Sequence, residues 1–287
     1  MPVVLARLRM PLVYLGLAAV AVDSFVVDLP RWPVLGLLAV AFAIYLRVGT
    51  VRRPPVLVAP PVAGRWLAFN SPASRVPSHH LHAYGQTYAI DLVHEPAGGR
   101  RPGLSWWPLA RRPADFPGFG QPVLAPADAT VVRAHDAERD HWSRSSPLAL
   151  CYLVAEGMVR ELLGPGRILD NHVVLDLGGG VYAALAHLRR GSLRVRPGDR
   201  VAAGQALAEC GNSGNSSEPH LHFQLMDHPS VLLAAGLPVR FARYRVGDAD
   251  RAGVPRNLEP FTAPRLAVRC AARSRRGTGG RSGGRRR

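Results

Sequence analysis

Lysine is absent from this chain of 287 residues, and all 36 of its basic side chains are arginine. Biotin and lipoate are carried on a lysine side chain, so the sequence excludes a biotinyl or lipoyl carrier. Cysteine is scarce, because the chain has only Cys151, Cys210 and Cys270, and no CxxC pair. This excludes a disulfide framework and a cysteine-based zinc site.

Hydrophobic residues make up 47% of the chain, which is enough to build a core. The 26 prolines and 29 glycines are spread along the sequence, a distribution that indicates many turns and short elements. The composition therefore favours a mainly β protein over a helical bundle.

Positive charge is concentrated at the C-terminus. Nine arginines and no acidic residue lie in the last 23 residues, so this stretch carries more than half of the formal net charge of +16. We predict a disordered Arg/Gly-rich tail over residues 263–287. It suits contact with an anionic polymer or lipid, and no specific nucleic-acid partner is expected. A solvated tail without a partner is the alternative interpretation.

The first fifty residues contain two apolar segments, of roughly 17 and 14 residues, near or below the ~20 needed to cross a bilayer. They predict a transmembrane helical hairpin over residues 1–50, or one full span and a partial one, although Asp23 weakens the first segment. A secretory signal and buried helices are the alternatives. Arginines flank both ends of the pair, which for two spans would leave the remainder in the cytoplasm.

A Pro-rich linker is expected over residues 51–64, followed by one domain over residues 65–262. Short β-like runs separated by turn signals fill this domain. One stretch differs, because residues 146–164 have helical length, with Ser145 or Ser146 as N-cap and Gly164 as C-cap. We predict a helical insertion between two strands.

The stretch "EPHLHFQL" places two histidines two residues apart in a predicted strand. Side chains alternate between the faces of a strand, so His220 and His222 lie on one face, and Leu221 and Phe223 on the other. This arrangement suits a metal site in which one imidazole is a ligand and its neighbour handles protons.

Further candidates lie at the ends of other β-like runs. Asp91 ends "QTYAID", His187 ends "VYAALAH", and the loop "SHHLHAYGQ" contributes His79, His80 and His82. A carboxylate and imidazoles are typical ligands of catalytic zinc, which lowers the pKa of its water to about 7.

The ordered motifs "YAID", "PVLAPADATVV", "NHVVLDLGGGVYAALAHL" and "CGNSGNSSEPHLHF" resemble the lysostaphin-type (LytM-domain) zinc metallopeptidases, over about residues 79–228. The resemblance implies an antiparallel β-sheet metallopeptidase domain of the duplicated hybrid motif type. It also implies that Asp91 and His222 are zinc ligands, and that His187 and His220 are catalytic histidines that do not bind the metal.

One position departs from the pattern of this family, whose first ligand lies four residues before the aspartate. That position is Thr87 here, which cannot replace an imidazole. The third ligand is therefore expected from "SHHLHAYGQ", with His82 as the first choice, His79 as its alternative and His80 less favoured.

Together these features predict a membrane-anchored zinc metalloendopeptidase that hydrolyses peptide bonds of peptidoglycan with a zinc-activated water. A catalytically degenerate relative that binds cell wall or activates another hydrolase is the alternative. Since peptidoglycan lies outside the membrane, we expect an extracellular catalytic domain, in conflict with the flanking arginines.

Overall fold

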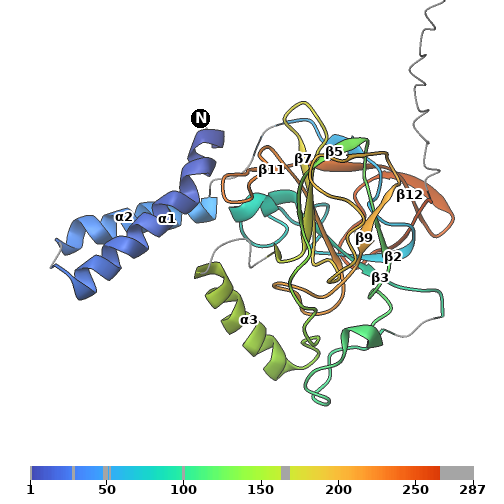
Figure 1. Ribbon diagram of the computed structural model, residues 1–287, viewed down its shortest axis with the longest axis horizontal. Helices are drawn as coiled ribbons and strands as arrows, with labels where there is room; N and C mark the ends of the chain where they lie inside the picture. The colour runs from blue at the N-terminus through green and yellow to red at the C-terminus, as the bar shows by residue number, and fades with distance from the viewer. Residues whose placement is uncertain are drawn as a thin grey trace, which may run out of the picture.

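The computed structural model describes residues 2–27, 30–47, 51, 53–98, 101–162 and 169–265. A pair of N-terminal helices precedes a mainly β domain (Figure 1). The predicted C-cap at Gly164 and nearly all of the predicted disordered tail, from residue 266 onward, lie outside the described residues.

The elements follow one another in a simple order. The α-helices are α1 (Pro2–Phe25), α2 (Arg31–Arg47) and α3 (Pro147–Leu162), and the 3-10 helices are η1 (Ala83–Tyr88) and η2 (Pro113–Asp115). The strands are β1 (Val56–Val58), β2 (Gly64–Phe69), β3 (Ile90–His94), β4 (Pro122–Leu124), β5 (Ala129–His135), β6 (His172–Asp176), β7 (Tyr182–Ala186), β8 (Arg200–Val201), β9 (Ala206–Glu209), β10 (Leu221–Met226), β11 (Gly236–Leu237), β12 (Val239–Val246), β13 (Ala249–Gly253) and β14 (Pro260–Ala263).

One large sheet dominates the domain, in the order β1-β12-β14-β2-β3-β10-β7-β6-β5-β8, with β11 paired to β10 and β13 to β12. A second sheet pairs β4 with β9. All these pairs are antiparallel except β1 with β12, which is parallel. The predicted mainly β, antiparallel domain is confirmed. Residues 51–64, predicted as a linker, contain β1 and so contribute a strand to the sheet.

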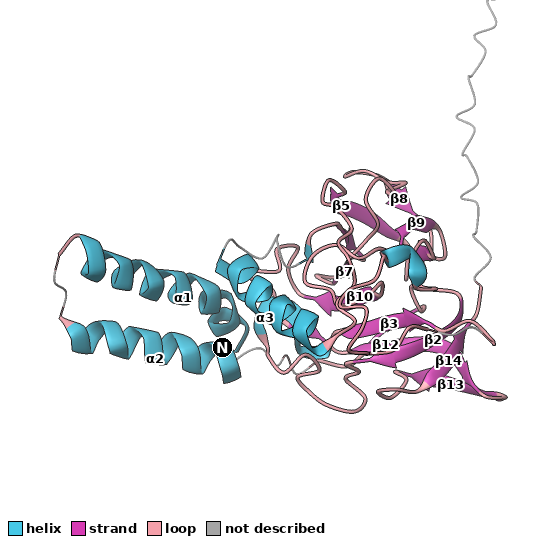
Figure 2. Cartoon of the chain, turned by 90° about the horizontal axis from the view of Figure 1, so that it is seen from below, coloured by secondary structure: helices cyan, strands magenta, loops and turns pink. Residues whose placement is uncertain are grey.

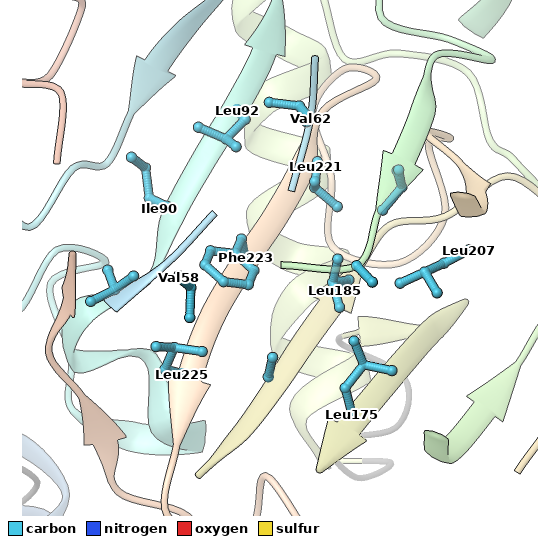
Figure 3. Close-up of a cluster of buried hydrophobic side chains, with 14 of the residues drawn as sticks. Val58, Val62, Ile90, Leu92, Leu175, Leu185, Leu207, Leu221, Phe223 and Leu225 are labelled. Carbon is cyan, nitrogen blue, oxygen red and sulfur yellow. The ribbon is translucent and has the colours of Figure 1, made fainter. Parts of the chain in front are cut away.

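Strand β10 lies in the middle of the sheet, between β3 and β7, and all of its residues are buried. Leu221, Phe223 and Leu225 point into the main hydrophobic core, where Ile90 of β3 and Leu185 of β7 also lie (Figure 3). The period-two alternation of a strand then places His222 on the opposite face. The predicted orientation of "PHLHF" is therefore present in the structure.

Helices α1 and α2 lie side by side, as the sequence predicts for the two apolar segments (Figure 2). Helix α2 has 17 residues, and the sequence of α1 includes Arg7, Arg9 and Asp23. Within the part of the chain that the structure describes, no helix is both long enough and apolar enough to cross a membrane. The transmembrane character predicted for the hairpin is not confirmed.

Helix α3 is the predicted insertion, and it separates β5 from β6 in the chain. Ser146 caps it, because its Oγ accepts a hydrogen bond from the Ala149 backbone N–H at 3.2 Å. Glu156 attaches the helix to the domain through Arg144, with Oε2 2.7 Å from Nη2. Arg160 continues this network, with Nη1 3.1 Å from Asp170 Oδ2.

Candidate metal centre

The centre of the site is a carboxylate held between two imidazoles. The register of β3 and β10 sets Asp91 directly opposite His222, with Asp91 Oδ1 2.9 Å from His222 Nδ1. His79 approaches the other oxygen, with Nε2 3.0 Å from Oδ2. One ligand atom from each of the three residues lies within 4.8 Å of the others.

His82 does not join this cluster. Its Nδ1 lies 3.1 Å from Oγ1 of Thr87, the residue at the position where the resembling family has its first ligand. The structure therefore favours His79, the alternative from the sequence, over His82, the first choice.

Backbone conformation explains why closeness along the chain is a poor guide to the ligand here. His80 and Tyr84 have φ values of 66° and 58°, in the left-handed region, so the loop turns twice between His79 and β3. The histidine farther from the strand in sequence is consequently the one that reaches Asp91. His80 is exposed at the first of these turns.

Gln224 fixes the orientation of the His222 ring. Its Nε2 donates to the Tyr84 carbonyl at 2.8 Å, so its Oε1 accepts from His222 Nε2–H at 2.9 Å. Nδ1 is then the nitrogen of His222 that is available as a ligand. Burial alone would lower the pKa of His222, but the hydrogen bond to Asp91 and the charge of that carboxylate raise it.

Ser78 fixes the orientation of the His79 ring in the same way. Its hydroxyl donates to the Gln86 carbonyl at 3.2 Å and lies 3.1 Å from His79 Nδ1, from which it can accept a hydrogen bond. Nε2 of His79 is thereby left to face Asp91.

Asp91 is buried, and its charge is stabilised by its neighbours. Burial alone would raise its pKa, but the charges of His79 and His220 and the hydrogen bonds from the adjacent imidazoles hold the pKa well below its usual range. Asn70 adds a hydrogen bond from Nδ2 to Oδ2 at 2.7 Å. The carboxylate is therefore ionised and oriented, as a metal ligand must be.

His187 follows β7 with a φ of 62°, an uncommon conformation for a residue with a side chain. Its Nδ1–H donates to the Ser213 carbonyl at 2.9 Å, which leaves a lone pair on Nε2. Burial lowers its pKa well below the usual value, and the nearby His220 and His222 lower it further. His187 is therefore a neutral imidazole at neutral pH.

His220 lies beside His187, with the two ring centroids 4.8 Å apart. Its Nδ1 is 2.8 Å from the Glu218 carbonyl, to which it can donate, and its Nε2 is 3.6 Å from Asp91 Oδ1. The structure thus brings both predicted non-ligand histidines to the edge of the cluster.

These groups share one pocket of about 240 Å³, to which α3 contributes Leu153. Its lining consists of Asn70, His79, Gln86, Asp91, Leu153, Leu169, His187, Asn215, Ser217, His220 and His222. Two imidazole nitrogens and a carboxylate oxygen are a donor set that catalytic zinc takes, with a further position left for water or substrate. The residues present therefore fit a zinc ion.

Three contributors to the site were not anticipated from the sequence: Asn70, Ser78 and Gln224. A signal existed for Gln224, because it lies two residues after His222 and so shares its face of β10. Asn70 and Ser78 lie in turns without periodicity, and nothing in the sequence distinguished them.

Comparison with known proteins gives the same family as the motifs. Residues 151–232 match peptidase family M23, which confirms the resemblance to the lysostaphin-type peptidases. No curated protein sequence matches the chain.

Several solved structures are similar to the chain. The catalytic domain of lysostaphin from Staphylococcus simulans is 18% identical, with 61% of this chain and 88% of that chain covered and a TM-score of 0.32. A catalytic-domain mutant of the prophage-encoded M23 protein EnpA from Enterococcus faecalis is 22% identical, with 49% and 82% covered and a TM-score of 0.28. A chain of the SpoIIQ–SpoIIIAH pore forming complex is 18% identical, with 62% and 87% covered and a TM-score of 0.34.

Proposed function

Since the chain carries a peptidase family M23 sequence, we propose that it is a zinc metalloendopeptidase that hydrolyses peptide bonds of peptidoglycan. The observation that carries the proposal is the cluster of His79, Asp91 and His222, whose ligand atoms lie within 4.8 Å of one another. Two further histidines beside this cluster provide the acid–base groups that hydrolysis requires.

When bound, zinc supplies a Lewis acid and lowers the pKa of a coordinated water to about 7. His79 Nε2, His222 Nδ1 and an oxygen of Asp91 would hold it. The lone pair on His187 Nε2 can take a proton from the attacking water, because its Nδ1–H is committed to the Ser213 carbonyl. His220, whose Nε2 lies 3.6 Å from Asp91 Oδ1, would stabilise the developing oxyanion.

Burial of the residues that line the pocket also supports the reaction. His187 and His220 are both buried, so proton transfers to and from them occur away from bulk water. Electrostatic interactions are stronger in such surroundings than in solvent, which favours stabilisation of the oxyanion.

The location proposed for the domain follows from its substrate, because peptidoglycan lies outside the cytoplasmic membrane. In this proposal the N-terminal helices keep the domain near the membrane surface. Protease added to intact cells is expected to degrade the domain. Full protection of the domain in intact cells, with degradation only after lysis, would contradict an external location.

The proposed activity is tested on the purified full chain by zinc content and by mass spectrometry of peptides released from peptidoglycan. We expect one zinc per chain and cleavage of peptide bonds. His187→Ala should retain zinc and lose at least about 100-fold in kcat/KM, the usual contribution of a general base. His135→Ala, an exposed histidine on β5, is the matched control and should retain activity.

Two outcomes would overturn the proposal. Wild-type protein without stoichiometric zinc would favour the alternative of a degenerate protein that binds cell wall. Full activity of His187→Ala would remove the acid–base assignment.

A further inference from the structure

A second cavity, of about 230 Å³, adjoins the metal pocket. Ser217 lines both cavities, and α3 lines both, through Leu153 at the metal pocket and Leu150 at the second cavity. The complete lining of the second cavity is Arg101, Pro102, Gly103, Leu104, Phe116, Arg144, Ser145, Leu150, Ser217 and Glu218. A substrate that reaches the metal ligands can therefore extend into this second cavity.

Two arginines, Arg101 and Arg144, line the second cavity. The Arg101 guanidinium lies over the Phe69 ring, 5.1 Å from its centroid. Phe69 directly precedes Asn70, whose side chain donates a hydrogen bond to Asp91. Arg144 is only 9% exposed and enters the cavity beside the N-terminus of α3. Arg101 is thus held beside the strand end that precedes Asn70, and Arg144 is held by Glu156 of the helix that borders the metal pocket.

The cavity holds more hydrogen-bond donors than its own acceptors satisfy. Among the described residues, Arg144 Nε and the Ser145 hydroxyl are buried without a hydrogen-bond partner, and Arg101 Nη1 makes no hydrogen bond beyond its ion pair with Glu218. Buried polar groups nearly always have partners, so two such groups beside a buried arginine nitrogen around one cavity indicate a ligand that accepts hydrogen bonds.

The acidic groups nearby do not satisfy all of these hydrogen-bond donors. Glu218 Oε1 lies 3.4 Å from Arg101 Nη1, and Glu156 engages Arg144 through Nη2. Glu218 is the one acidic residue among those that line the cavity, against two arginines. Ser145 also directly precedes Ser146, the N-cap of α3, where the helix dipole favours negative charge.

We propose that this cavity binds a carboxylate of the substrate peptide, next to the residues at the scissile bond. The inference rests on the proposed function and narrows its substrate class to peptides with a free carboxylate at that position. Guanidinium groups recognise carboxylates through charge-assisted hydrogen bonds, and the Ser145 hydroxyl can donate a further one. Arg101 and Arg144 are then specificity residues rather than catalytic ones.

The test varies the substrate first, so that it does not depend on a mutation. Zinc-loaded full-length protein is assayed with a soluble stem peptide of peptidoglycan and with analogues in which one carboxyl at a time is converted to an amide. We expect one of the amidations to lower kcat/KM by roughly tenfold, as for the loss of one charge-assisted hydrogen bond. Arg101→Gln should lower the activity on the free carboxylate and abolish this discrimination.

Arg139→Gln is the matched control, because Arg139 is exposed and lines a neighbouring pocket but not this cavity. It should preserve the tenfold discrimination. Ser145→Ala provides a second variant that removes a donor without changing the charge, and it should weaken the discrimination. Arg144 is left unchanged, since its ion pair with Glu156 also anchors α3.

Failure of this inference differs from failure of the proposed function. Cleavage of all analogues at the wild-type rate would overturn the carboxylate subsite and leave the peptidase intact. If no peptide is cleaved, calorimetric titration with the same peptides decides the subsite separately. In that titration, a Kd roughly tenfold lower for the peptide with the free carboxylate, and loss of this difference in Arg101→Gln, would uphold the subsite. Equal Kd values for all the peptides would overturn it.

Discussion

Asp91 and His222 are direct cross-strand partners, although 131 residues separate them in the chain. Adjacent antiparallel strands hold directly opposite side chains about 5 Å apart at Cβ, a distance that the sheet itself maintains. The carboxylate and the imidazole therefore meet because β3 and β10 pair, whereas His79 reaches them from a loop. The strand-borne Asp91 and His222 and the loop-borne His79 should therefore respond differently to mutation.

Substitution of His79 or His82 by alanine, one at a time, distinguishes these two candidates for the third ligand. We expect His79→Ala to lose stoichiometric zinc, because Nε2 of His79 lies 3.0 Å from Asp91 Oδ2. His82→Ala is the matched control from the same loop and should retain zinc, because His82 Nδ1 lies 3.1 Å from Thr87 Oγ1, outside the cluster. Zinc content is measured by atomic absorption after gel filtration. Loss of zinc from His82→Ala with retention by His79→Ala would reverse the assignment.

Gln224 should tune the affinity for zinc without being a ligand. Gln224→Leu removes the acceptor that holds His222 Nε2–H and the donor to the Tyr84 carbonyl. We expect zinc affinity to fall 10- to 100-fold, the usual effect of a lost partner behind a metal ligand. Kd is measured by competition with a chelator. Gln121→Leu, which removes a hydrogen bond to the Pro117 carbonyl, is the control, and an equal loss of affinity in both variants would contradict the role.

His141 should make stability depend on pH. Burial lowers its pKa, and the charges of Arg144 and Arg160 lower it further, so the native protein keeps it neutral. The unfolded chain takes up a proton at this residue near pH 6.5, and stability therefore falls as the pH falls below that value. The loss is at most about 1.4 kcal/mol per pH unit for one proton.

Denaturant unfolding between about pH 8 and pH 5.5, with a chelator present, measures this dependence on either side of the ordinary histidine pKa. The difference in unfolding free energy between wild type and His141→Gln should be constant above about pH 7.5 and should narrow on acidification. Parallel curves over the whole range would exclude His141 as a source of the pH dependence.

Helix α3 should loosen when its ionic anchor is removed. Glu156→Gln leaves the Arg144 guanidinium, which is 9% exposed, without its charged partner. We expect a loss of roughly 1–3 kcal/mol and faster amide hydrogen exchange over residues 147–162. Glu95→Gln, which breaks the exposed pair with Arg65, is the control and should cost less than about 1 kcal/mol. Unchanged exchange in α3 would show that packing alone holds the helix.

The strand-borne half of the site could be predicted from the sequence because strand geometry is regular. Alternation along "PHLHF" places His220 and His222 on the face opposite Leu221 and Phe223, and both apolar side chains are fully buried in the core. The sequence likewise predicts a helix over residues 146–164, and α3 spans Pro147–Leu162. Both predictions depend on the length and pattern of a regular element.

The loop-borne half could not be predicted in the same way. The choice between His79 and His82 depends on the left-handed conformations of His80, Tyr84 and Gly85, and of these only the glycine is a strong turn signal in the sequence. Asn70 likewise reaches Asp91 from a turn. Hydrophobicity predicts the N-terminal helices, but hydrophobicity alone does not establish a membrane span.

The insertion of α3 has a consequence for how this domain can change. The segment between Asp91 and His222 already contains a 16-residue helix, yet the two proposed ligands stay paired because each is held by its own strand. Doubling the length of a flexible loop costs only about 0.6 kcal/mol. The junction between β5 and β6 is therefore a place where the chain can gain or exchange a whole element, and with it a new wall for the substrate, while the chemistry stays in place.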